Sequence, residues 1–267
     1  MNDLEYEQLG QRIRRLLRID LAAYKPQQMR RRLDSYVARS GHASASAFID
    51  SLATDASAVK DLRNMLTINV SEFFRDADQF ERLATDVLPS LLRARQGTLN
   101  VWSAACSHGE EPYSIAIILR ELAASHRSKI VATDIDREVL ARAQDGGPYH
   151  PNELRNVSPK RRTEYFNESG GVFTIVDAIR SRVAFRELNL LEDRFDRGFD
   201  LIVCRNVMIY FSDETKKALF ERLHDSLIPG GVLFLGGAEA LLTTGRDTFE
   251  RIGGNFYRKP TAAAAAA

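Results

Sequence analysis

The stretch VWSAACSHGEEPYSIA, residues 101–116, decides the fold of this chain. It begins as an apolar strand, turns through small and polar residues, and continues as a helix. In nucleotide-binding folds such a turn usually carries several glycines, which let the backbone approach phosphate groups. Here the turn has one glycine, Gly109, followed by the carboxylates Glu110 and Glu111. The pattern therefore argues against a pyrophosphate ligand.

Apolar runs alternate with helical segments on the carboxyl side of this stretch. Strands are expected at residues 99–104, 129–136, 182–188, 200–206 and 231–237, with helices at 110–123, 137–146 and 213–227. Strands separated by helices of this length predict an α/β, Rossmann-like domain with a parallel sheet and helices on both faces. A terminal hairpin is expected at residues 249–259, with its turn at 253–255.

The front of the chain has a different pattern, because it lacks strand signals and places apolar residues at helical spacing. We predict a helical domain and linker over residues 1–88 and the sheet domain over 89–260. Residues near 165–187 alternate around a Gly-Gly turn, which predicts a small antiparallel β-subdomain inserted in the sheet domain. Residues 261–267, a threonine and six alanines, are interpreted as a tail or expression remnant.

Composition sets broad limits on the class of protein. The 267 residues include 44% hydrophobic and 27% charged residues. Their net charge is +1, so the overall charge does not favour binding to nucleic acid. No signal peptide and no apolar run of about 18 residues is present, so we expect a cytoplasmic protein without membrane insertion. Cys106, Cys204 and His108 are expected to be packing or bystander residues, and no metal site is predicted.

Parallel sheets bind ligands outside the carboxyl ends of their strands. Asp134 ends the second predicted strand, at the place where nucleotide-binding folds hold ribose hydroxyls. The alternative is a helix N-cap, for which Asp136 is better placed. S-adenosylmethionine fits the turn, because it carries adenosine and a cationic end but no phosphate, and carboxylates favour such a ligand. The competing interpretation is that Glu110 and Glu111 only complement the helix dipole.

The runs VWSAACSHGEEPYSIA, ATDID, NLL and CRNVMIYF resemble the chemotaxis receptor methyltransferases, the CheR-type protein-glutamate O-methyltransferases. The similarity extends from about residue 66 to 257, and the helical front is similar in kind to the N-terminal domain of that family. The resemblance implies methyl transfer from S-adenosylmethionine, with S-adenosylhomocysteine as product. The acceptors it implies are glutamates on the cytoplasmic helices of chemoreceptors.

The resemblance also implies roles for single residues. Arg75 and Tyr210 would be the catalytic residues, facing the acceptor carboxylate and the methyl group. Glu111 would hold the methionine end of the cofactor and Asp134 its ribose. The implied cofactor-binding residues are Asn69, Ser71, Arg75, Glu111, Asp134, Asn189, Leu190, Arg205 and Asn206. The family usually has threonine in place of Ser71, and Gly-His-Ser-Glu in place of Gly-Gly-Ala-Glu at residues 236–239.

Each of these residues has a plainer interpretation. Arg75 could be a surface arginine paired with Asp76 or Asp78, and Tyr210 and Phe211 could be core aromatics that close the sheet. Asp76 has the spacing of a capping box with Gln79. A glutamate acceptor is already ionised at neutral pH, so the reaction needs positioning rather than a general base.

The partner is expected to be a chemoreceptor helical domain. Residues 12–39 are strongly basic, and Arg30, Arg31 and Arg32 are proposed as the docking face for glutamate-rich helices. The compact β-subdomain suggests that no receptor C-terminal peptide tether is needed. Two alternatives stay open: the same chemistry on a non-chemotaxis signalling protein, and a non-catalytic module that senses S-adenosylmethionine or S-adenosylhomocysteine. A nucleic-acid methyltransferase is disfavoured because the chain lacks an NPPY-like run.

Overall fold

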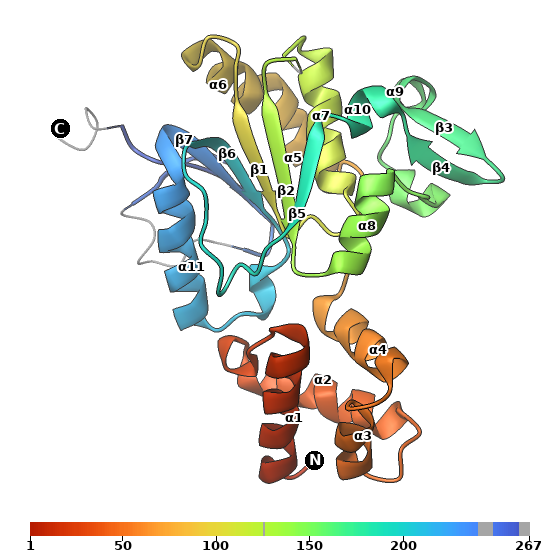
Figure 1. Ribbon diagram of the computed structural model, residues 1–267. Coiled ribbons are helices and arrows are strands. Elements are labelled where there is room, and N and C mark those ends of the chain that lie inside the picture. The colour runs from red at the N-terminus through yellow and green to blue at the C-terminus, as the bar shows by residue number, and fades with distance from the viewer. Residues whose placement is uncertain (125, 240–247, 262–267) are drawn as a thin grey trace. The chain divides into compact units, whose positions relative to one another are not determined.

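The computed structural model describes residues 1–124, 126–239 and 248–261 (Figure 1). The predicted tail lies outside these residues apart from Thr261. Internal contacts group the chain into a helical unit, Met1–Asn69 with Met208–Lys216, and a sheet unit, Val70–Val207 with Lys217–Ala267. Residues 70–88, which the sequence assigns to the N-terminal domain, therefore group with the sheet.

The helical unit contains α1 (Asp3–Leu17), η1 (Leu21–Ala23), α2 (Pro26–Arg39), α3 (Ala45–Ser51), α4 (Ala56–Thr67) and η4 (Met208–Tyr210). Local sequence defines the helix starts. Asn2 and Glu5 form a capping box at α1, Ser44 caps α3, and Asp55 caps α4. The apolar faces meet in a small core that includes Leu9, Ile13, Leu33 and Val37.

The sheet unit has one seven-stranded sheet in the order β5-β2-β1-β6-β7-β9-β8. The parallel strands are β1 (Asn100–Ala104), β2 (Lys129–Asp134), β5 (Val183–Glu187), β6 (Phe199–Cys204) and β7 (Leu227–Leu235). The antiparallel hairpin of β8 (Glu250–Gly253) and β9 (Phe256–Arg258) completes the sheet, which confirms the predicted strands and terminal hairpin.

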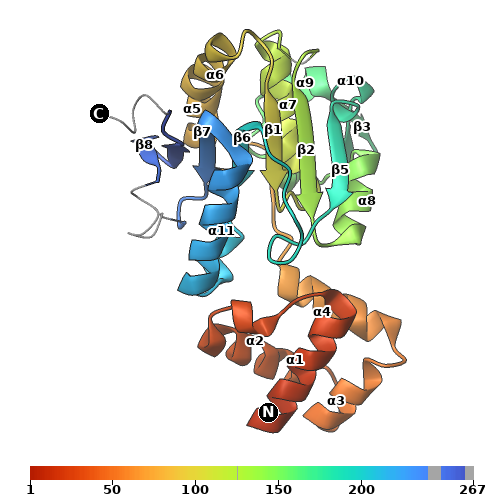
Figure 2. The same cartoon turned by 60° about the vertical axis from the view of Figure 1, so that its left-hand side comes forward.

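Helices connect β1 to β2, β2 to β5 and β6 to β7 and cover both faces (Figure 2), as predicted, whereas β5 leads to β6 without a helix. The main connections use α7 (Glu110–Glu121), α8 (Arg137–Asp145) and α11 (Asp213–Ser226). In the strand order, β1 leads to β2 on one side and β6 leads to β7 on the other. Crossovers between parallel strands are right-handed as a rule, so these two connections are expected on opposite faces. Consequently α7 and α11 lie on opposite faces (Figure 2). The sheet unit also contains α5 (Ala77–Arg82), η2 (Leu83–Val87), α6 (Leu88–Ala94), η3 (Pro151–Leu154), α9 (Pro159–Tyr165) and α10 (Asp177–Arg180).

A separate two-stranded antiparallel sheet of β3 (Phe166–Ser169) and β4 (Val172–Ile175) forms the predicted β-subdomain (Figure 1). It ends before β5, which belongs to the main sheet, so it is shorter than the predicted span of 165–187. Aromatic packing joins it to the linker that follows α4. Phe73 contacts Tyr149 and Phe166 edge-on, with ring centroids 4.8 and 4.9 Å apart.

Candidate functional site

The order of the strands places the candidate site. The sheet reverses its direction of growth between β1 and β6, which is the switch point at which open α/β sheets bind ligands. The loops that follow β1 and β6 carry the SAACSHGEE and CRN runs, and those that follow β2, β5 and β7 flank them. All five loops leave the same edge of the sheet, because these strands are parallel.

The turn between β1 and α7 is tight and specific in shape. Ala105, Ser107 and Gly109 all have positive φ, at 63°, 51° and 94°. A Cβ on Gly109 would lie 3.0 Å from the Ala143 Cβ and from a ring atom of Tyr113. The single glycine of the turn therefore allows close packing of α7 on α8.

Asp134, at the end of β2, holds this turn in place. Its Oδ2 accepts a hydrogen bond from the Ser107 N–H at 2.8 Å, and its Oδ1 accepts one from the Asp136 N–H at 3.1 Å. Burial raises the pKa of Asp134 to about 6, although the two N–H donors oppose the shift. Asp136 caps α8 through the Glu138 N–H, as the sequence predicted. The ribose role of Asp134 stays a prediction.

The Glu111 carboxylate, in the first turn of α7, lies beside a hydroxyl group and a guanidinium. Its Oε1 accepts a hydrogen bond from the Ser103 hydroxyl at 2.7 Å, and its Oε2 lies 3.6 Å from the Arg205 guanidinium. Burial raises the pKa of Glu111, whereas Arg205 and Ser103 lower it. Glu111, whose side chain is 12% exposed, thus has partners that favour its ionised form, which suits a cationic ligand.

Arg205, which follows β6, has a side chain only 2% exposed. Besides Glu111 it pairs with the Asp76 carboxylate and donates to the Arg75 carbonyl at 3.0 Å. Its guanidinium also lies over the Phe234 ring, 4.7 Å from the centroid. A buried guanidinium requires such partners, and they tie the linker segment to the loop after β6.

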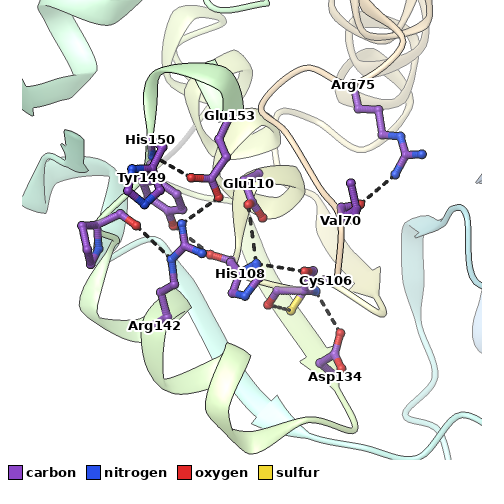
Figure 3. Close-up of polar contacts among 12 residues, drawn as sticks. Val70, Arg75, Cys106, His108, Glu110, Asp134, Arg142, Tyr149, His150 and Glu153 are labelled. Atoms are coloured by element: carbon purple, nitrogen blue, oxygen red, sulfur yellow. Dashed lines mark hydrogen bonds and ion pairs between the residues drawn. The ribbon is translucent and has the colours of Figure 1, made fainter. Parts of the chain in front are cut away.

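The capping-box prediction for Asp76 is wrong. Asp76 occupies the N-cap position of α5 with a left-handed φ of 61°, and its side chain makes no cap hydrogen bond. The carboxylate pairs with Arg205 instead. The interpretation of Arg75 as a surface arginine paired with Asp76 also needs correction, because the Asp76 carboxylate pairs with Arg205. The Arg75 guanidinium donates to the Val70 carbonyl at 3.0 Å (Figure 3).

A residue that sequence reasoning missed is Glu239, which follows β7. Its buried Oε2 accepts hydrogen bonds from the backbone N–H of Asn206 at 2.7 Å and of Gly236 at 3.0 Å. Asn206 has a left-handed φ of 60°, so Glu239 stabilises the turn that directs the Arg205–Asn206 pair. In the sequence, the signal for Glu239 is that this chain keeps the glutamate of the family's usual Gly-His-Ser-Glu run, although the His and Ser are replaced.

The close packing at Gly236 gives a testable prediction. A Cβ there would lie 2.7 Å from the Glu239 Oε2 and 3.0 Å from the Asn206 amide nitrogen. We expect Gly236→Ala to reduce the free energy of unfolding by about 1–3 kcal/mol, as overpacking does. Chemical denaturation measures this, with Gly237→Ala as matched control because its Cβ would meet its nearest neighbour at 3.7 Å. Equal stability of the two variants would contradict the role assigned to the Glu239 turn.

The NLL run lies in the loop after β5. The Asn189 N–H donates to the Asp193 carboxylate at 2.8 Å, and its Oδ1 accepts from the Leu191 N–H at 3.0 Å. The Leu190 carbonyl accepts from Arg222. These bonds fix the loop conformation, and the adenine role of Asn189 and Leu190 stays a prediction.

The remaining candidate residues divide between the units. Ser71 belongs to the sheet unit, whereas Asn69 and Tyr210 belong to the helical unit. The Asn69 amide donates to the Thr67 hydroxyl at 3.0 Å, and the Tyr210 carbonyl accepts from the Lys25 N–H at 3.0 Å. Phe211 is buried as expected, but it packs edge-on against Tyr24 of the helical unit and does not close the sheet.

The two thiols are buried and belong to Cys106 and Cys204. Burial raises the pKa of both far above that of a reactive cysteine. They act as small apolar side chains, as predicted.

Comparison with known proteins gives consistent matches. Residues 69–257 match the family described as CheR methyltransferase, SAM binding domain, and residues 4–67 match its all-alpha domain. A chemotaxis protein methyltransferase of Listeria monocytogenes is 39% identical over 247 residues, covering 92% of this chain and 94% of the relative. Chemotaxis protein methyltransferase 1 of Pseudomonas aeruginosa is 38% identical over 234 residues, covering 84% and 85%. Among solved structures, PKMT2 from Rickettsia typhi in complex with AdoHcy is 19% identical to this chain, with a TM-score of 0.35. The match covers 52% of this chain and 21% of PKMT2, and a similarity this weak supports no conclusion about function.

Proposed function

The chain belongs to the CheR methyltransferase family, and from this premise we infer that it is an S-adenosylmethionine-dependent chemotaxis methyltransferase that methylates glutamate side chains of chemoreceptors. The observation that carries this conclusion is the match of both family domains, together with 39% identity to a chemotaxis methyltransferase over 94% of its length. The site agrees with it, because one glycine and a partnered, half-buried carboxylate suit a cationic ligand without phosphates.

We propose specific residues for binding the cofactor. Glu111 holds the ammonium of the methionine end, for which its half-buried carboxylate, bonded to Ser103 and close to Arg205, is suited. Asp134 holds the ribose, and Asn189 with Leu190 lies beside the adenine. The proposed set is completed by Asn69, Ser71, Arg75, Arg205 and Asn206. When bound, S-adenosylmethionine supplies an electrophilic methyl group on a cationic sulfur.

The catalytic work of the chain is proposed to be positioning. A glutamate acceptor has a pKa near 4.3 and is already a nucleophile at neutral pH, so no general base is required. Arg75 orients the acceptor carboxylate through its planar pair of N–H donors. Tyr210 steadies the reacting groups with its ring or hydroxyl. Arg75 must not hold the carboxylate too tightly, because the charge of the nucleophile is lost in the reaction.

A methyl-transfer assay tests this function. The full chain is incubated with a chemoreceptor cytoplasmic fragment and S-adenosylmethionine labelled in the methyl group, and the product is treated with base. Glutamate methyl esters release labelled methanol, whereas N-methyl groups do not. Binding of the cofactor without labelling of any receptor fragment would favour the sensing module. Labelling of other signalling proteins alone would favour the alternative target.

The docking face for the receptor is proposed to lie on α2. Arg31 is exposed there, whereas Arg30 donates to Asp3 and to the Met1 carbonyl, and Arg32 donates to the Met65 carbonyl. Arg31 is therefore the best of the three arginines to mutate. Its replacement leaves intact the internal hydrogen bonds that Arg30 and Arg32 make.

We expect Arg31→Ala to weaken receptor binding about two- to threefold at low ionic strength and to have a smaller effect at high salt, as screening predicts. Titration of a receptor fragment at 50 and 500 mM salt measures this. The matched control is Arg93→Ala, at an exposed arginine of α6 in the sheet unit. Equal effects of the two substitutions would place the docking face elsewhere.

We also propose that methylation does not require a receptor C-terminal peptide tether. Support comes from the small β-subdomain, which has two strands of four residues joined at Gly170 and Gly171. Receptor fragments with and without their last residues distinguish the two cases in the same assay.

No helix among the described residues is long and apolar enough to cross a bilayer. We propose that the protein acts in the cytoplasm, where its acceptor helices lie.

A further inference from the structure

The first carboxylate of the GEE run, Glu110, has an environment opposite to that of its neighbour. Its side chain is 0% exposed, and neither of its oxygens makes a hydrogen bond of normal geometry within the described residues. Glu111, one residue later, has the Ser103 hydroxyl and the Arg205 guanidinium. An ionised carboxylate without donors is very unfavourable in the interior, so the two side chains cannot be treated alike.

Glu110 faces a second carboxylate and the His108 ring, whose Nδ1 lies 3.8 Å from the Glu110 Oε1. One of its oxygens, one of Glu153 and a ring nitrogen of His108 all lie within 4.8 Å of one another (Figure 3). The Glu153 oxygens accept hydrogen bonds from Arg142 at 2.7 Å and from the His150 N–H at 2.6 Å, so both oxygens already act as acceptors. Each of these oxygens retains a second lone pair that can accept a proton donor.

The protonation of this cluster follows from its neighbours. Burial, and to a smaller extent the proximity of Glu153, raises the pKa of Glu110 to about 8, while its own backbone N–H and then Arg142 oppose the shift. Burial and Arg142 lower the pKa of His108, so the imidazole is neutral and supplies no positive charge. The other titratable groups near Glu110 are the Tyr149 hydroxyl and the Cys106 thiol, whose raised pKa values keep them neutral.

Three segments of the site meet at this cluster. The Tyr149 hydroxyl donates to the His108 carbonyl at 2.8 Å, in the turn before α7. The Phe73 N–H donates to the Glu153 carbonyl at 2.9 Å, which connects η3 to the linker that carries Ser71 and Arg75. Tyr149 also pairs with Phe173 of β4. The conformation of η3 therefore affects the cofactor turn, the linker and the β-subdomain together.

We propose that Glu110 is a positioning residue that works as a neutral carboxylic acid, donating its proton to the Glu153 carboxylate and so holding η3 against the turn that carries Glu111. The adjacent carboxyl groups then have opposite protonation states. Glu111 is ionised for the cationic cofactor, and Glu110 is neutral for the internal hydrogen bond, a division of the kind that environment creates between paired carboxyls. Only the cofactor-binding part of this inference rests on the proposed function.

A divalent cation held by His108, Glu110 and Glu153 is the competing explanation of the cluster. The guanidinium of Arg142 is bonded to Glu153 and would repel such an ion. The structure therefore favours a proton between the two carboxyls over a metal ion.

The test compares the wild-type chain with Glu110→Gln, which keeps a neutral donor at every pH. A raised folded-state pKa contributes stability that is lost as pH increases from the unfolded value, 4.5, to about 8. The melting temperature of the wild type minus that of Glu110→Gln should therefore fall between pH 5.5 and 8 and level off above pH 8. This measurement requires no cofactor, so it can fail or succeed independently of the proposed function.

Cofactor affinity provides the second measurement. Between pH 7 and 9.5, the dissociation constant for S-adenosylmethionine should rise about tenfold in the wild type relative to Glu110→Gln. Glu110→Ala, which lacks the donor, should bind weakly throughout. Parallel pH profiles of the wild type and Glu110→Gln in both measurements would overturn the proposal. Stabilisation of the wild type, but not of Glu110→Gln, by added Zn²⁺ or Mn²⁺ would overturn it in favour of a metal site.

Discussion

Replacing Arg75 with alanine is expected to lower the methyl-transfer rate about 100- to 1000-fold, with at most about a threefold change in affinity for S-adenosylmethionine. The guanidinium donates one hydrogen bond to the Val70 carbonyl in the part of the chain that the structure describes, and guanidinium has five N–H donors. The remaining donors can orient an acceptor carboxylate. Because that contact positions the nucleophile, its loss should affect the rate more than cofactor binding.

Two measurements separate this role from a general binding role. Single-turnover transfer to a receptor fragment gives the rate, and calorimetry with S-adenosylmethionine alone gives the cofactor affinity. Arg75→Lys is the control, since it keeps the positive charge but loses the planar pair of donors, and it should recover only part of the rate. Equal fractional losses in rate and affinity in Arg75→Ala would assign Arg75 to cofactor binding alone.

Glu111→Gln should weaken the binding of S-adenosylmethionine about 100-fold, the size expected when a charge-assisted hydrogen bond in a half-buried site is lost. Glutamine can still accept the hydrogen bond from Ser103, and Arg205 keeps its partner Asp76, so the folded structure should be preserved. The loss of affinity would therefore report on the charge of Glu111 and not on the packing of α7.

The product S-adenosylhomocysteine makes this test specific. It retains the ammonium group of the methionine end but lacks the sulfonium charge. If Glu111 binds the ammonium, calorimetry should give the same fractional loss for both ligands. A loss for S-adenosylmethionine alone would place Glu111 near the sulfur. Ser103→Ala is the companion variant, because it removes the neutral partner of Glu111 and should cost about tenfold or less.

Local sequence signals predicted most of the sheet unit. Apolar runs located all five parallel strands, and Gly253-Gly254-Asn255 located the terminal hairpin. Asp136 was recognised as a helix cap because a cap depends on residues two or three positions away. The same local rule failed for Asp76, whose carboxylate is held by Arg205, 129 positions along the chain. A capping pattern contains no information about so distant a partner.

The sequence by itself determined the α/β class of the sheet unit, the helical class of the front and the turn with one glycine and two carboxylates, because these depend on the periodicity and chemistry of neighbouring residues. Only the tertiary structure decided that Glu239 supports Asn206, that Arg205 joins Asp76 to Glu111, and that Glu110 faces Glu153 while Glu111 faces Arg205. Adjacent glutamates on a helix point in different directions and enter different surroundings. Their protonation is set by burial and by partners distant in sequence, which become neighbours only when the chain folds.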